Sequence, residues 1–109
     1  MTEASRVQRH VDAFNAAVRD GRWSTFADRF TADARMRFVG VPAGPFAGRA
    51  EIAAAYARQP PAETLRVRRI ETAGDVDVVG FEWASGATGT MRLEWAADEL
   101  AVLEIAFDE

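Results

Sequence analysis

The second half of the chain alternates apolar and polar residues, and this pattern limits the folds open to it. From Glu63 onward the period is two, in segments near 64–72, 76–84, 88–96 and 99–107. Gly74-Asp75, Ser85-Gly86 and Ala97-Asp98 separate these segments. The spacing predicts four strands joined by tight hairpins. Apolar residues fall on one face of the predicted sheet: Val79, Phe81, Trp83, Met91, Leu93, Trp95, Leu103, Ile105 and Phe107.

The first half of the chain has a helical pattern instead. Val7, Val11, Phe14 and Val18 recur at helical spacing up to Gly21, which predicts an amphipathic helix over residues 3–20. A second helix is expected from about Arg22 to Phe30, with its aromatic residues on one side. The alternation around 35–39 predicts a strand, and the two prolines within 41–48 predict an irregular loop. A third helix is expected from about Arg49 to Arg58, before Pro60-Pro61 ends it.

These elements must cover the single apolar face of the sheet. A sheet of this kind can bury that face only by curling around the helices. We therefore predict an α+β fold in which three N-terminal helices pack in a strongly curved antiparallel sheet, forming a cone with an open end. The chain of 109 residues is large enough for one core and too small for two, so residues 1–109 are expected to form a single domain.

Composition and charge exclude several classes of function. The formal net charge of -4 argues against a nucleic-acid partner, which would require a basic surface. Cysteine is absent and His10 is the only histidine, so no metal site or disulfide is expected, and nothing in the sequence indicates a cofactor. No uncharged stretch approaches the ~18 residues of a membrane span, and no apolar leader follows the first residues. We expect a soluble cytoplasmic protein that does not bind a membrane.

The stretch from Gly44 to Tyr56 carries a resemblance to a known family. A Gly/Pro turn there runs straight into an Ala-rich helix with Ile52 and Tyr56 on one face. With helices before it and strands after it, the chain resembles the nuclear transport factor 2-like superfamily, which includes ketosteroid isomerases and SnoaL-type polyketide cyclases. The resemblance spans nearly the whole chain and implies the cone-shaped α+β fold.

The resemblance also places catalytic positions, and these positions carry unreactive residues here. Ketosteroid isomerase uses an Asp base beside Tyr and protonated Asp oxyanion donors. By the resemblance, Phe14 and Met91 occupy the donor positions and Phe38 occupies the position of the base. Tyr56 matches a tyrosine that supports the oxyanion donor, and its usual companion is replaced by Phe30. Because Phe and Met can neither take a proton nor stabilise an enolate, isomerisation by that mechanism is not expected.

An apolar cone remains, and we predict that it binds a small hydrophobic metabolite. Aromatic walls and a flexible thioether suit a flat ring system. The alternative is a closed, filled core, which would make the protein a pure interaction module. Trp23 and Trp83 are expected at the rim of the pocket. The predicted ligand-binding residues are Phe14, Phe30, Phe38, Tyr56, Met91, Leu103 and Phe107.

His10 supports an alternative function. It lies one turn before Phe14, at the edge of the inner face of the first helix. Some polyketide cyclases use a histidine with an acidic partner, so His10, Tyr56 or both could serve an isomerase, cyclase or dehydratase. The simpler interpretation is a half-exposed helix residue without a functional role. Asp12 and Asn15 are expected to face solvent.

The polar face of the sheet gives two further interpretations. A one-residue slip in register would turn Glu82, Arg92, Glu94 and Glu104 inward, and the set would then resemble the acid-Arg-acid arrangement of limonene-epoxide-hydrolase-like members. Such a slip would expel Phe81 and Leu93 from the core, at a cost of roughly 25 cal/mol per Å² of apolar surface. In the expected register this face, with Arg66, Arg68 and Thr90, forms a homodimer interface or a solvated ion-pair lattice.

Overall fold

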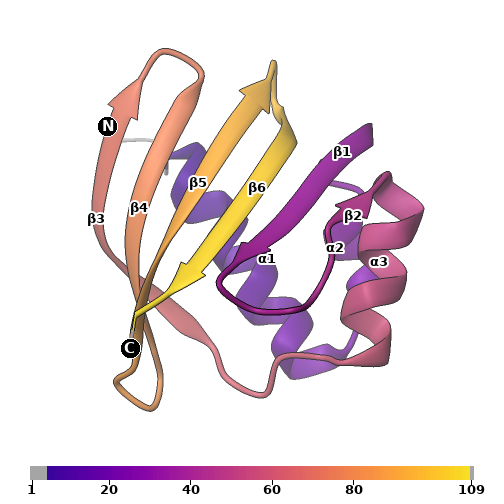
Figure 1. The fold of residues 1–109 in the computed structure, drawn as a ribbon, viewed down its shortest axis with the longest axis horizontal. Helices are drawn as coiled ribbons and strands as arrows, with labels where there is room; N and C mark the ends of the chain where they lie inside the picture. Colours follow the sequence, from indigo (N-terminus) through magenta and orange to yellow (C-terminus); the bar gives the residue numbers. More distant parts are fainter. Residues whose placement is uncertain (1–4, 109) are drawn as a thin grey trace.

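The computed structural model describes residues 5–108 and has the predicted α+β architecture. A six-stranded curved sheet lies against three helices (Figure 1). The helices are α1 (Arg6–Asp20), α2 (Trp23–Ala27) and α3 (Arg49–Arg58). The strands are β1 (Phe30–Val39), β2 (Phe46–Ala47), β3 (Leu65–Ala73), β4 (Val76–Trp83), β5 (Thr88–Ala96) and β6 (Glu99–Phe107). The predicted start of the first helix at residue 3 lies outside the described residues.

The strand order in the sheet is β2-β1-β6-β5-β4-β3. The four C-terminal strands pair antiparallel through successive hairpins, as predicted. In contrast, β1 pairs with β6 in parallel, with Met36 beside Leu103 and Phe38 beside Ile105. The sheet is therefore not purely antiparallel. A parallel pair needs a long connection between its strands, and here that connection contains α3 and the other three long strands.

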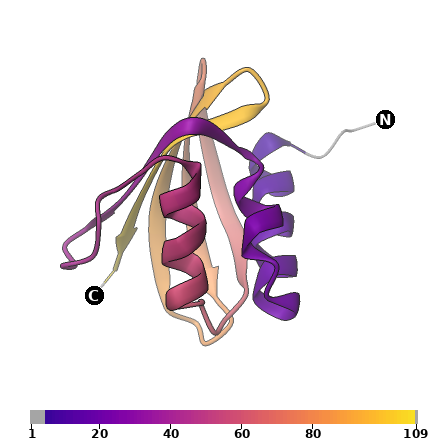
Figure 2. The ribbon, with the colours of Figure 1, turned by 90° about the vertical axis from the view of Figure 1, so that its right-hand side faces the viewer.

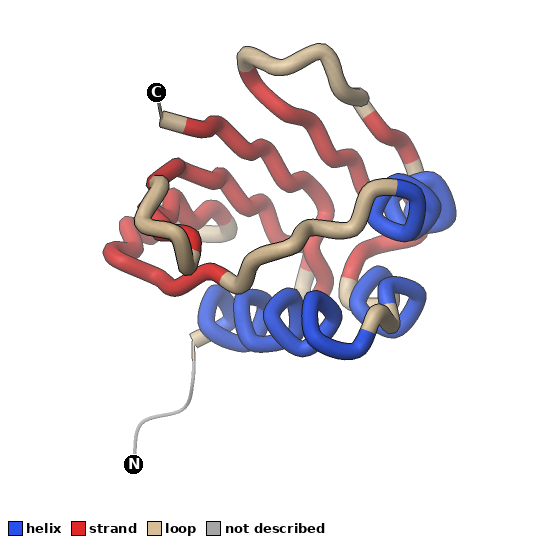
Figure 3. Tube along the Cα trace, turned by 90° about the horizontal axis from the view of Figure 1, so that it is seen from below, coloured by secondary structure: helices blue, strands red, loops and turns tan. Residues whose placement is uncertain are grey.

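The sheet curls around the helices on one side, which Figures 2 and 3 show from two directions. Irregularities in strand pairing occur at three places. They lie between Phe30 and Arg35 in β1, between Val67 and Arg69 in β3, and at Ala101 in β6, between the partners of Glu94 and Trp95. Bulges of this kind increase the local twist and bend a strand. They give the sheet its cone-like curvature.

Helix α1 follows its predicted pattern closely. The Ser5 hydroxyl accepts a hydrogen bond from the Gln8 N–H at 3.0 Å and caps the start of the helix. At the other end, Gly21 adopts a left-handed φ of 76° and its N–H donates to the carbonyl of Ala17, a conformation that glycine adopts without steric cost. Val11 and Phe14 are buried on the inner face of the helix.

The second helix is shorter than predicted, because Phe30 belongs to the sheet. Helix α2 ends at Ala27, and Phe30 is the first residue of β1. Its carbonyl accepts two hydrogen bonds from the Arg49 guanidinium, at 2.6 and 3.0 Å, and its backbone lies beside Leu100 of β6. Trp23, Phe26 and Phe30 have helical spacing because all three are buried in the same core. The first two belong to α2 and the third to β1.

The Gly/Pro loop before α3 contains a short strand that the sequence pattern did not predict. Residues Phe46 and Ala47 form β2, which pairs antiparallel with β1 at Met36 and Arg35. The Gly48 N–H then donates to the carbonyl of Ala34 at 2.7 Å. Gly48 has a φ of 93°, which L residues rarely adopt, and this turn directs the chain into α3.

The two faces of the sheet divide largely as predicted. Val79, Phe81 and Leu93 are buried. On the outer face, Arg66 pairs with Glu82 at 2.6 Å, Arg37 with Glu104 at 3.0 Å, and Arg92 with Glu94 at 3.6 Å. The inward slip that would form an acid-Arg-acid site is therefore not present. Phe107 departs from the pattern, since 40% of its surface is exposed.

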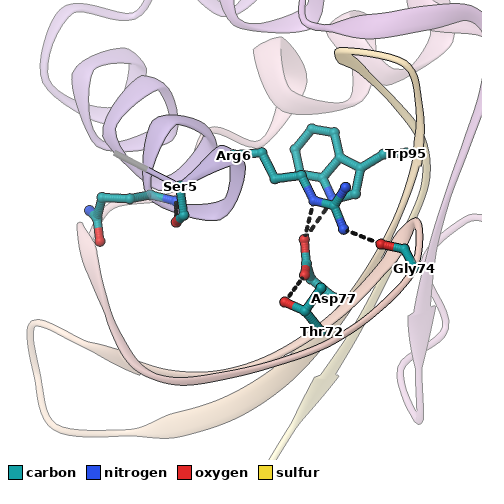
Figure 4. Close-up of polar contacts among 7 residues, drawn as sticks. Ser5, Arg6, Thr72, Gly74, Asp77 and Trp95 are labelled. Atoms are coloured by element: carbon teal, nitrogen blue, oxygen red, sulfur yellow. Dashed lines mark hydrogen bonds and ion pairs between the residues drawn. The ribbon is translucent and has the colours of Figure 1, made fainter. Parts of the chain in front are cut away.

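A buried carboxylate joins α1 to the β3–β4 hairpin (Figure 4). The side chain of Asp77 is 1% exposed. Its Oδ2 accepts hydrogen bonds from Arg6 Nε at 2.6 Å and Trp95 Nε1 at 2.9 Å, and its Oδ1 accepts one from the Thr72 hydroxyl. Burial would raise the pKa of Asp77, but the hydrogen bonds from Arg6, Thr72 and Trp95 outweigh burial and lower it.

Asn15 forms a second attachment between α1 and the sheet. Its side-chain amide donates to the carbonyl of Leu65 at 2.8 Å and accepts from the Leu65 N–H at 2.9 Å. Both backbone groups of the first residue in β3 are thereby satisfied by one side chain. The expectation that Asn15 faces solvent was wrong, whereas Asp12 is exposed and accepts a hydrogen bond from Gln8.

We expect Asp77→Asn to lower the free energy of unfolding at pH 7 by about 2 to 3 kcal/mol, because charge-assisted hydrogen bonds are replaced by weaker ones. The folded-state pKa is depressed, so this stability is present above the ordinary value of 3.8 and is lost as the pH falls through the folded value. Urea unfolding at several pH values measures the difference. Asp75→Asn, on the exposed turn of the same hairpin, is the control. Equal stability of the two variants at pH 7 would refute this role.

Candidate functional site

A cavity of about 470 Å³ lies between the helices and the concave face of the sheet. Its wall comes from α1, α3, the β1–β2 loop, the segment between α3 and β3, and all six strands. The exposed residues that line it, including Val41, Gln59 and Phe107, mark its opening. Their segments lie together at the lower part of Figure 1, away from the β3–β4 hairpin that holds Asp77.

The predicted ligand-binding residues lie in two environments. Phe14, Phe38, Tyr56, Met91, Leu103 and Phe107 all line the cavity. Phe30 is fully buried and lies outside that lining. Of the two tryptophans expected at the rim, Trp83 lines the cavity, whereas Trp23 is 4% exposed and belongs to the core. Whether these residues contact a ligand stays a prediction.

One side of the cone is filled with packed rings. Trp23 stacks on Tyr56 with ring centroids 4.7 Å apart and an interplanar angle of 8°. Phe26 contacts Tyr56 and Phe30 edge to face, at 5.4 and 5.5 Å. These arrangements are the favoured ones for aromatic pairs. These packed rings support the ring of Tyr56, which also lines the cavity.

The other side of the cone, toward the opening, carries a second group of rings. Phe107 stacks against Phe38 at 6.1 Å and against Trp83 at 6.4 Å. We call Phe38, Trp83 and Phe107 the aromatic row. Phe46 of β2 meets Phe38 edge to face at 6.4 Å. Sequence analysis did not select Phe46 or Val41, although both are apolar residues in the irregular loop that it predicted over 41–48.

The polar side chains on the lining are few: His10, Tyr56, Gln59 and Glu63. Glu63 was missed by sequence analysis, because a single acid at the start of a strand carries no distinctive pattern. The remaining lining residues are apolar. Within residues 5–108, no three potential metal ligands of the His, Cys, Asp or Glu type cluster together.

His10 is buried, so the interpretation of His10 as a half-exposed helix residue was wrong. Its side chain is packed among Phe26, Phe30 and Trp95, with ring centroids 5.3, 6.0 and 6.4 Å away. Nδ1 has no hydrogen-bond partner among the described residues. Burial, together with the nearby charge of Arg29, lowers the pKa of His10 to about 3. The imidazole is therefore neutral at physiological pH.

Tyr56 is the other ionisable group on the inner lining. Burial raises the pKa of its hydroxyl above the usual value, so the phenol stays protonated at physiological pH. It can donate a hydrogen bond but is a poor proton donor in catalysis.

The acids and arginines of the outer face do not contribute to this cavity, since none of Glu82, Arg92, Glu94 and Glu104 lines it.

Comparison with known proteins agrees with this geometry. The family model described as a SnoaL-like domain matches residues 7–105. The chain belongs to the SnoaL-like family. The superfamily predicted from the Gly44 to Tyr56 stretch is thereby confirmed. No curated protein matches the SnoaL-like chain.

Solved structures share the fold at low sequence identity. A SnoaL-like protein of unknown function from Burkholderia thailandensis has a TM-score of 0.75 at 11% identity, with 98% of each chain covered. An NTF-2 like protein of unknown function from Burkholderia xenovorans has a TM-score of 0.73 at 17% identity, covering 95% of this chain and 84% of that chain.

A third similar structure contains a small ligand. It is a hypothetical protein with a ketosteroid isomerase-like fold from Catenulispora acidiphila, in complex with trimethylamine. Its TM-score is 0.68 at 18% identity, and the match covers 88% of the SnoaL-like chain and 82% of that chain. At these identities the likeness shows the fold alone.

The burial of neutral His10 predicts a pH-dependent stability. Between pH 6.5 and about 3 the unfolded chain binds a proton at His10 that the folded protein does not. Protonation of His10 in the unfolded chain therefore leaves the free energy of unfolding unchanged above pH 6.5. Below pH 6.5 it lowers that free energy by about 1.4 kcal/mol for each pH unit. His10→Leu should lack this component, so its stability relative to wild type rises as the pH falls from 7 to 5. Urea unfolding measures both proteins. Parallel pH profiles would contradict the buried neutral state.

Proposed function

We propose that the protein binds a small hydrophobic molecule in the cone. The observation that carries this proposal is the cavity of about 470 Å³ with a predominantly apolar and aromatic lining, beside a tightly filled core. Cavities of 300 to 1,000 Å³ with few polar groups are typical small-molecule sites. The trimethylamine in the similar Catenulispora structure supports a ligand-binding role for this fold.

The ionisation of the lining favours binding over acid-base catalysis. A general base works best when its pKa lies near the working pH. The pKa of His10 is lowered to about 3, and the pKa of Tyr56 is raised, so both move away from neutrality. An isomerase, cyclase or dehydratase that depends on these residues is therefore the weaker alternative. The positions of the base and oxyanion donors in ketosteroid isomerase are taken by Phe38, Phe14 and Met91.

A cavity-filling substitution tests the binding role. Phe38→Trp adds a larger ring to the open part of the cone, so it should leave stability within about 1 kcal/mol of wild type and weaken binding of a neutral aromatic probe at least about tenfold. The probe is 2-naphthol, and calorimetric titration measures its affinity. Thermal unfolding measures stability.

The matched control is Phe26→Trp, which places the same ring in the filled core. Phe26 is 2% exposed and does not line the cavity, so overpacking should cost roughly 1 to 3 kcal/mol. If Phe38→Trp loses as much stability as Phe26→Trp and wild type does not bind 2-naphthol, the cone is closed and the binding role is wrong.

We also propose that the protein forms a homodimer through the outer face of the sheet. This face carries both signs of charge, in Arg37, Arg66, Arg92, Glu82, Glu94 and Glu104. A surface with both signs can be complementary to its own two-fold copy.

None of the described helices is long and apolar enough to cross a membrane.

Charge reversal on this face tests the dimer. Arg92→Glu should shift the protein from dimer toward monomer, because it puts a third acid beside Glu94 and the cross-strand neighbour Glu104. Light scattering at micromolar concentration measures the mass. Arg58→Glu, with the same charge change on the exposed end of α3, should leave the mass unchanged. A monomeric wild type would exclude this interface.

A further inference from the structure

The charge of the cavity lining restricts the chemical class of the ligand more than the apolar character of the lining does. The chain carries 13 basic residues, all of them arginine, yet none lines the cavity. Among the described lining residues, Glu63 is the only charged side chain. An anionic ligand would leave water, meet no counter-charge and lie near a carboxylate, which is unfavourable in a low-dielectric site. The lining therefore disfavours carboxylates, phosphates and sulfates.

Glu63 is held in place at the same side of the cavity as the aromatic row. The Ser85 N–H donates to Glu63 Oε1 at 2.7 Å. Ser85 lies in the β4–β5 turn, two residues after Trp83, and the Ala84 N–H donates to the carbonyl of Thr64, the residue after Glu63. These bonds place the start of β3 beside the end of β4. Glu63 and Trp83 both line the cavity.

The aromatic row adds a second attraction for positive charge. The face of an aromatic ring is electronegative, and tryptophan is the most effective of the aromatic residues for binding a cation. Trp83 and Phe38 flank Phe107, which is 40% exposed at the opening.

We propose that the ligand is an organic cation, a tertiary or quaternary ammonium attached to an apolar body. The ammonium group lies near the opening, between the Glu63 carboxylate and the rings of Trp83 and Phe107. The apolar body fills the inner part of the cavity toward Phe14 and Met91. A quaternary ammonium fits this site well because it needs no hydrogen-bond acceptors, and few polar groups line the inner cavity. This inference rests on the proposed binding function and names its ligand class.

Three compounds of similar shape test the inference by calorimetric titration. They are (3-hydroxyphenyl)trimethylammonium, its neutral isostere 3-tert-butylphenol, and the anion 3-hydroxybenzenesulfonate, at a pH where each phenol is protonated. The ammonium compound should bind about tenfold more tightly than the neutral isostere, as expected for a partly desolvated cation on aromatic rings beside a carboxylate. The sulfonate should bind more weakly than the neutral compound.

Two variants and a control locate the effect. Glu63→Gln keeps an oxygen for the Ser85 N–H, so it should weaken ammonium binding several-fold and leave 3-tert-butylphenol unchanged. Trp83→Leu should weaken ammonium binding more than neutral binding, which separates a cation effect from a loss of contact area. Glu82→Gln makes the same charge change on the outer face, where Glu82 pairs with Arg66, and should alter neither affinity.

The outcomes separate this inference from the binding function on which it rests. If 3-tert-butylphenol binds as tightly as the ammonium compound, or the sulfonate binds best, the cationic ligand class is wrong and the hydrophobic-binding function stands. The same conclusion follows if Glu63→Gln and Glu82→Gln have equal effects. If none of the three compounds binds to wild type, the binding function itself fails, and the cation inference fails with it.

Discussion

The structure depends on how α1 is held across the concave face of the sheet. Apolar contacts alone would permit the helix to slide or rotate, because hydrophobic burial is not directional. Two polar attachments fix its position: Arg6 with the buried Asp77 near its start, and Asn15 with the backbone of Leu65 along its length. Burying a polar group costs free energy unless its hydrogen-bond partner is in place, so each attachment favours one position of the helix. In that position, His10 and Phe14 of α1 lie on the cavity wall.

The cavity persists because the cone is filled unevenly. Helix α2 and the start of β1 bring Trp23, Phe26 and Phe30 together on one side, where ring contacts leave no space. On the other side, α3, the β1–β2 loop and the strands line the open cavity. Register shifts in three strand pairs bend the sheet. The same curvature that buries the apolar face therefore prevents the helices from filling it.

The sequence predicted what depends on period and composition. The strand segments and the third helix lie close to their predicted limits, because alternation and turn residues act locally. Phe30 satisfied both the helical spacing and the burial of a strand, and only its long-range pairing with Leu100 decides between them. Sequence analysis did not select Asp77, although it is in phase with Val79 and Phe81. The division between open and filled parts of the cone depends on distances between elements that no local pattern contains.

The parallel pairing of β1 with β6 has a consequence for synthesis on the ribosome. Strand β6 lies between β1 and β5, so β1 has no long partner in the sheet until β6 has emerged. The hairpins formed by β3, β4 and β5 can assemble earlier, since their contacts are local. The parallel contact between distant segments must close last and is expected to limit the folding rate. A nascent chain that lacks β6 also lacks Leu103, Ile105 and Phe107 of the cavity wall, so a ligand could assist only the final step of folding.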